Sequence, residues 1–176
     1  MDLRYVDEFL YHGIRNPHSL EKLESIFKSG MIKSGKNIDG YMNYSDNCNK
    51  GEFVSLLRFS NEIGFDVFIN ENISLIIRDD ISYIETTYLP FHEWEKRKDD
   101  GYFSYLNGEL LSKDIPFSMV VGIGLPYSKL KGMNVDAETI YKDITSLMEK
   151  YNITLPIVDT SRYNVSVNKT KKLSGI

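Results

Sequence analysis

The chain has 176 residues, 41% of them hydrophobic, which is enough for one compact domain with a sizeable apolar core. We therefore expect a single domain over residues 1–176. The formal net charge of -4 argues against general, charge-driven binding to nucleic acid. The lone cysteine, Cys48, excludes an internal disulfide and a cysteine-based zinc site.

The sequence carries no sign of export or of membrane insertion. Residues 1–5 lack the basic region and apolar run of a secretory signal, and no stretch approaches the roughly 18 apolar residues that span a bilayer. We expect a soluble protein without a membrane partner, either cytoplasmic or secreted by a signal-independent route.

The first expected elements are a short strand at residues 9–11 and a helix at residues 20–28. Ser19 is the expected N-cap of this helix, and Gly30 is the expected left-handed residue after it. The apolar residues of the helix fall on one face, as their spacing shows: Leu20, Leu23, Ile26 and Phe27. Residues 33–50 are polar and lack periodicity, which predicts a long loop of the kind that often covers a binding site.

Strand composition returns at residues 52–59 and 73–77. Alternation in the first of these places Ser55 on an otherwise apolar face. A second irregular, charged stretch spans residues 86–107 and predicts a short exposed helix or lid. Glu109 then opens another strand.

The last third of the chain predicts an apolar strand at residues 117–125, a helix and a terminal strand at residues 153–158. Asp136 is the expected cap of the helix, and Asn152 is expected to end it. Its buried stripe consists of Ile140, Ile144, Leu147, Met148 and Tyr151. This order of elements predicts an α+β domain.

Common catalytic signatures are missing from the sequence. Gly122-Ile123-Gly124 lacks the third glycine of a dinucleotide-binding loop, so we interpret it as strand packing. His92 has no second histidine four residues later, which removes the zinc-protease pattern, and we expect no metal site.

One constellation remains: His12-Gly13 ends the first strand, Ser55 lies in a middle strand, and Glu109 begins a late strand. In this order and spacing the three segments resemble the ADP-ribosyltransferase fold of toxins, DNA- or protein-modifying enzymes and poly-ADP-ribose polymerases. The resemblance covers about the first three quarters of the chain, and Ile14 stands where many members have Thr or Ser. It implies two small packed sheets with flanking helices, forming a cleft.

The resemblance also implies a chemistry, in which NAD is the co-substrate and its nicotinamide–ribose bond is cleaved. A carboxylate near the ribose stabilises the positive charge that develops there, a role that falls to Glu109. By the same resemblance His12 binds the adenosine ribose, the Gly13 backbone holds the nicotinamide amide, and Ser55 supports Glu109. Tyr41 or Tyr44 would stack on the nicotinamide ring.

The resemblance extends to partners. It implies mono-ADP-ribosylation of a macromolecular acceptor, protein or nucleic acid, by a toxin or effector with an antitoxin or immunity partner. Asn107 stands where the arginine-modifying branch has Glu or Gln, which argues against an arginine acceptor.

Each of these residues also has a purely structural interpretation. His12 fits a strand-end histidine bonded to backbone groups, Gly13 a turn residue, and Ser55 a buried hydroxyl bonded to a neighbouring strand. Gly108-Glu109 fits a hairpin turn with an exposed carboxylate.

Three alternative functions compete with the transferase. In a cysteine hydrolase or deamidase, Cys48 would be the nucleophile, His12 or His92 the base, and Asp159 the orienting acid. A non-catalytic binding module could use the same fold for recognition. An NAD-consuming enzyme that removes phosphate from RNA would need more basic residues near the motifs than Arg15 and Arg58.

Overall fold

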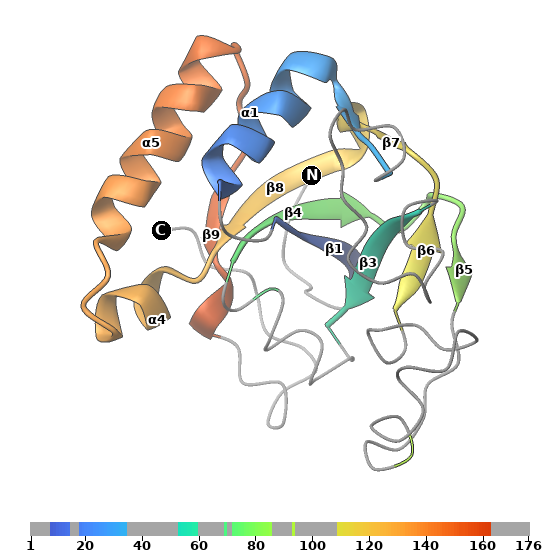
Figure 1. The fold of residues 1–176 in the computed structure, drawn as a ribbon, viewed down its shortest axis with the longest axis horizontal. Coiled ribbons are helices and arrows are strands. Elements are labelled where there is room, and N and C mark those ends of the chain that lie inside the picture. Colours follow the sequence, from blue (N-terminus) through green and yellow to red (C-terminus); the bar gives the residue numbers. More distant parts are fainter. Residues whose placement is uncertain are drawn as a thin grey trace.

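The computed structural model describes residues 8–14, 18–34, 53–59, 69, 72–85, 93 and 109–162. A seven-stranded sheet runs through the centre in the order β5-β6-β3-β1-β4-β8-β9, and β2 and β7 form a second, two-stranded sheet (Figure 1). The strands of the large sheet are β1 (Phe9–Ile14), β3 (Val54–Arg58), β4 (Ile73–Arg78), β5 (Ile84–Glu85), β6 (Leu110–Ser112), β8 (Val120–Leu125) and β9 (Ile157–Asp159). The small sheet pairs β2 (Met31–Ile32) with β7 (Ile115–Pro116).

The helices are α1 (Ser19–Ser29), α4 (Tyr127–Gly132) and α5 (Ala137–Lys150), with 3-10 turns η4 (Phe117–Met119) and η5 (Thr160–Arg162). All pairs within the large sheet are antiparallel except β8 with β9. The expected α+β fold with two sheets is therefore confirmed, although the sheets are very unequal in size. No helix within the described ranges is long and apolar enough to cross a membrane.

Helices α1 and α5 cover one face of the large sheet, which we call the helix face (Figure 1). Beneath them lies the main apolar core, which includes Leu10 and Ile14 of β1, Leu75 of β4, Ile123 of β8, and Leu23 and Ile144 from the helices. Burying each such side chain contributes about 1.5–3 kcal/mol, so this layer supplies most of the driving force for folding.

Helix α1 forms where its apolar spacing predicts, but its N-terminal boundary differs from the expectation. Ser19 is already helical, and the cap position belongs to His18, whose φ of 66° is left-handed. The expected Ser19 cap is therefore wrong. At the other end Gly30 has φ 68°, as expected for a residue without a Cβ, and its N–H bonds the Ile26 carbonyl.

Helix α5 follows its predicted pattern closely. Asp136 accepts a hydrogen bond from the Thr139 N–H at 3.0 Å, which caps the first turn. Ile144 and Met148 are buried and the rest of the predicted stripe packs against the same core. Asn152, with φ 53°, ends the helix.

The opposite face of the sheet, which we call the open face, has a smaller apolar cluster. Its members are Phe9, Tyr11, Leu57, Phe59, Ile69, Ile76 and Val158. Alternation along β3 places Ser55 on this face beside Leu57, as the sequence predicts.

Two predicted strands are shorter than expected. Residues 117–119 form a 3-10 turn before β8, and the terminal strand is confined to Ile157–Asp159, where its parallel pairing with β8 begins. The two predicted loop segments fall outside the described residues, apart from residues 33, 34 and 93.

Candidate functional site

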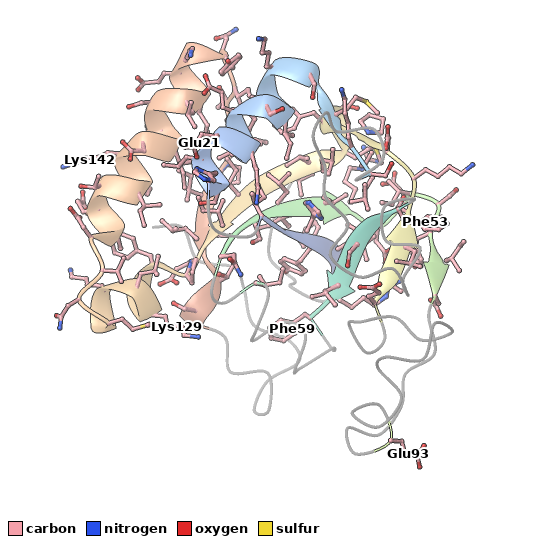
Figure 2. All side chains as sticks on the ribbon, viewed as in Figure 1. Glu21, Phe53, Phe59, Glu93, Lys129 and Lys142 are labelled. Carbon is pink, nitrogen blue, oxygen red and sulfur yellow. The ribbon has the colours of Figure 1, made fainter. Side chains whose placement is uncertain are left out.

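The sheet order places the three predicted motif strands side by side. β3 lies between β1, which carries His12, and β6, which begins directly after Glu109. Ser55 pairs with Leu111 of β6, and its hydroxyl faces Glu109. In Figure 2, the labelled Phe53 and Phe59 flank β3 and so mark the strand that holds Ser55. Residues separated by 43 and 54 positions in the chain thereby form one cluster.

Glu109 is a buried carboxylate, with only 1% of its surface exposed. The Ser55 hydroxyl donates a hydrogen bond to Glu109 Oε2 at 2.9 Å. A carboxylate taken out of water is costly unless its oxygens find donors, so this bond helps hold Glu109 in place. The interpretation of Glu109 as an exposed hairpin carboxylate is therefore wrong.

His12 is fixed by the backbone of the same serine. Its Nδ1 lies 2.9 Å from the Ser55 carbonyl oxygen. Because a carbonyl oxygen only accepts, Nδ1 carries the hydrogen and Nε2 of the neutral ring is an acceptor. Burial lowers the pKa of His12 below its ordinary value, and the Ser55 carbonyl opposes this effect only in part.

Ser55 thus contacts both partners, with its carbonyl on His12 and its hydroxyl on Glu109. The local pairing shows why the carbonyl is available. β1 pairs with β4 along its whole length, whereas its pairing with β3 is recorded at Leu10–Arg58 and Tyr11–Leu57. Next to these pairs the imidazole of His12, in place of a backbone N–H, reaches the Ser55 carbonyl.

A row of small residues continues across the open face from Gly13. Gly13 pairs with Ser74, which in turn pairs with Gly124. A Cβ at Gly124 would lie 2.2 Å from Ser74 Oγ and 2.6 Å from Thr160 Cγ2, so any larger residue would force these two side chains to shift. This accounts for the second glycine of Gly122-Ile123-Gly124 and confirms that the motif is strand packing.

Sequence reasoning did not single out Ser74 or Thr160. Among the described residues, their hydroxyls are the buried side-chain groups that lack a hydrogen-bond partner. Such groups carry a desolvation cost. The alternation of β4 could have predicted that Ser74 and the buried Leu75 point to opposite faces of the sheet. The contact between Ser74 and Gly124 could not be predicted locally, because it depends on pairing between strands some 50 positions apart.

Several predicted residues lie outside the described part of the chain. Tyr41, Tyr44, Cys48 and His92 are among them. Asp159 is described, and it has a structural role at the start of α4. It accepts hydrogen bonds from the backbone and side chain of Ser128 and of Ser161. Burial raises the pKa of Asp159, but these bonds outweigh it and lower the pKa overall.

Comparisons with known proteins bear on the fold. No protein-family model and no curated protein matches the sequence. Among solved structures, the chain is similar to Thermus sp. 2.9 DarT in complex with NAD+, with a TM-score of 0.52 and 10% identity. The match covers 89% of this chain and 98% of DarT. A structure of the same protein with carba-NAD+ has a TM-score of 0.46 and 11% identity, over 86% and 94% of the two chains. At this level of identity the likeness shows the fold, which is the ADP-ribosyltransferase-like fold that the sequence predicted.

Proposed function

We propose that this protein is an NAD-dependent mono-ADP-ribosyltransferase of the His-containing branch. The observation that carries the proposal is the shared use of Ser55, which ties His12 and Glu109 together on strands that the motifs predicted. The similarity to a protein solved with NAD+ supports the choice of co-substrate.

Glu109 is the catalytic residue of this proposal. The bond between nicotinamide and ribose breaks with its electron pair leaving on nicotinamide, and the ribose becomes oxocarbenium-like. A carboxylate held beside the ribose hydroxyls stabilises that charge more in the transition state than in the ground state. A nucleophilic group of the acceptor then forms the new bond to C1′ and releases its proton, and water in its place gives hydrolysis.

Ser55 positions Glu109 and also orients His12. With Nδ1 committed to the Ser55 carbonyl, Nε2 of His12 accepts a hydrogen bond from a hydroxyl of the adenosine ribose. The Gly13 backbone holds the nicotinamide amide, and Tyr41 or Tyr44 stacks on the nicotinamide ring. The acceptor is a macromolecule. The protein acts as a toxin or effector in the cytoplasm and has an antitoxin or immunity partner, and residues 1–176 act as one domain.

The decisive test compares the wild type with Glu109→Gln, using calorimetry for NAD binding and chromatography for nicotinamide release. We expect both proteins to bind NAD and Glu109→Gln to release nicotinamide about 10²–10³-fold more slowly, since one electrostatic contact to the transition state is lost. Glu149→Gln is a matched control, because Glu149 is an exposed glutamate on α5.

The alternatives give different outcomes in the same experiment. A binding module on this fold binds NAD or another ligand and releases no nicotinamide. A hydrolase that uses Cys48 releases no nicotinamide, and its hydrolytic activity is lost on alkylation and kept in Glu109→Gln. Failure of the folded wild type both to bind NAD and to release nicotinamide would end the transferase proposal.

A further inference from the structure

Ser74 of β4 carries a buried hydroxyl that has no hydrogen-bond partner. Its side chain is fully buried, and within the described part of the chain only Thr160 shares this combination of a buried and unbonded hydroxyl. Burying a hydroxyl without a bond costs free energy, because the water that bonds it in the unfolded chain is lost. A native fold that keeps such a group calls for an explanation, and a bond that forms only with a ligand is one.

The strand register places Ser74 beside the candidate site. β4 and β3 lie on either side of β1 (Figure 1). Ser74 pairs with Gly13, and directly paired residues point to the same side of a sheet. The register between β1 and β3, continued two residues beyond its recorded pairs, brings Gly13 opposite Ser55. Ser55, Gly13 and Ser74 therefore form one row on the open face, with the half-buried Gly13 in the middle.

The hydroxyl of Ser74 is directed away from this row, towards β8. A Cβ at Gly124 would lie 2.2 Å from Ser74 Oγ but 3.6 Å from Ser74 Cβ. Serine side chains occupy three staggered rotamers, and rotation of Ser74 about χ1 towards Gly13 breaks no side-chain hydrogen bond, because Oγ makes none. Paired residues lie about 5 Å apart between their Cα atoms. A group that is hydrogen-bonded to the Gly13 backbone is then within reach of the Ser74 hydroxyl.

The group that the proposed function seats on Gly13 is the carboxamide of nicotinamide. A carboxamide has two N–H donors and one oxygen with two lone pairs, whereas one backbone residue offers a single N–H and a single C=O. After bonding to the Gly13 backbone, the carboxamide still has one donor and one lone pair to satisfy. A serine hydroxyl can both donate and accept, so it fits either of them.

We propose that Ser74 is a second binding residue for the nicotinamide carboxamide, and that its hydroxyl turns from Gly124 towards the carboxamide when NAD binds. This inference rests on the proposed function and adds to that site a residue of β4, outside the three motif strands. The unbonded hydroxyl of the free protein then has a role, since its hydrogen bond forms in the complex.

The test measures binding by calorimetry and thermal unfolding of the free protein. Carba-NAD+, which lacks the ribose ring oxygen and is not cleaved, is compared with ADP-ribose, which has no nicotinamide. Ser74→Ala removes the hydroxyl, and Ser74→Gly is a second variant that also removes it. Thr160→Val is the matched control, because it removes the other unbonded hydroxyl, which follows β9 and lies two strands further from β1 than β4.

We expect Ser74→Ala to bind carba-NAD+ about 3- to 10-fold more weakly, the effect of one lost hydrogen bond, and to bind ADP-ribose like the wild type. Thr160→Val should bind both ligands like the wild type. Neither variant should unfold at a lower temperature, because each loses a buried hydroxyl that has no partner. This combination separates a binding role from a structural one.

Unchanged affinity for carba-NAD+ in both Ser74 variants would overturn the inference. Equal weakening of carba-NAD+ and ADP-ribose would also overturn it, because the hydroxyl would then act on the fold and not on nicotinamide. If the wild type releases nicotinamide from NAD while the Ser74 variants bind normally, the proposed function stands and only this inference fails. If the folded wild type neither binds NAD nor releases nicotinamide, both fail.

Discussion

The two faces of the large sheet differ in what they bury. The helix face buries a broad apolar layer between the sheet, α1 and α5. The open face has a smaller apolar cluster, and it also buries the carboxylate of Glu109 and the hydroxyls of Ser74 and Thr160. Apolar burial stabilises a fold, whereas buried polar groups cost free energy unless they are bonded. The helix face therefore supplies the stability that supports the polar groups of the open face, where Ser55 and Glu109 of the proposed site lie.

The largest effect expected from this comparison is a loss of stability on the helix face. Ile144 of α5 is fully buried, so Ile144→Ala should lower the free energy of unfolding by about 2–5 kcal/mol through lost burial and the resulting cavity. Urea unfolding measures this loss in the free energy of unfolding, and Lys142→Ala on the exposed side of α5 is the control. The rate of nicotinamide release per folded molecule should stay at the wild-type value. A rate that falls together with stability would show that the helix face also contributes to activity.

The opposite behaviour is expected on the open face. Ser55→Ala removes the hydroxyl that donates to Glu109 at 2.9 Å. A hydrogen bond to a charged group is worth about 1.5–3 kcal/mol, so nicotinamide release should fall roughly 10- to 100-fold. Ser55→Thr keeps the hydroxyl and should restore much of the rate. Equal rates in Ser55→Ala and the wild type would show that Glu109 does not depend on Ser55.

The elements of the helix face could be predicted because their signals are local. The apolar stripe of α5 and its cap Asp136 lie within 16 residues of one another, and both are where the sequence places them. The cap of α1 could not be predicted from preference alone. Serine favours that position, but His18 adopts the left-handed conformation and Ser19 enters the helix.

The candidate site was predicted in part. The motifs identified His12, Ser55 and Glu109, but not the carbonyl bond between Ser55 and His12. The row of Gly13, Ser74 and Gly124 depends on strand register, which no local pattern specifies when the partners are distant in sequence. Parallel pairing also sets the short length of β9.

The fit at Gly124 gives a sharper test of the open face. Gly124→Ala would bring a Cβ to 2.2 Å from Ser74 Oγ, and the strain should destabilise the fold by about 1–3 kcal/mol. Gly132 of α4 is the matched control, because a Cβ there meets nothing within 4 Å. Adding Ser74→Gly to Gly124→Ala should recover part of the loss in thermal unfolding. Equal melting temperatures for the two alanine variants would contradict the close contact.

The smallest expected effect is a pH dependence that comes from His12. Burial lowers the pKa of His12, so the folded protein holds the ring neutral where the unfolded chain takes up a proton. The stability from this group is fully present above the ordinary pKa of 6.5 and is lost as the pH falls below it towards the lowered value. Urea midpoints at pH 8 and pH 5.5 should therefore differ more in the wild type than in His12→Gln. A slope that survives in His12→Gln would place the titrating group elsewhere on the molecule and remove the reason to assign a neutral, accepting Nε2 to His12.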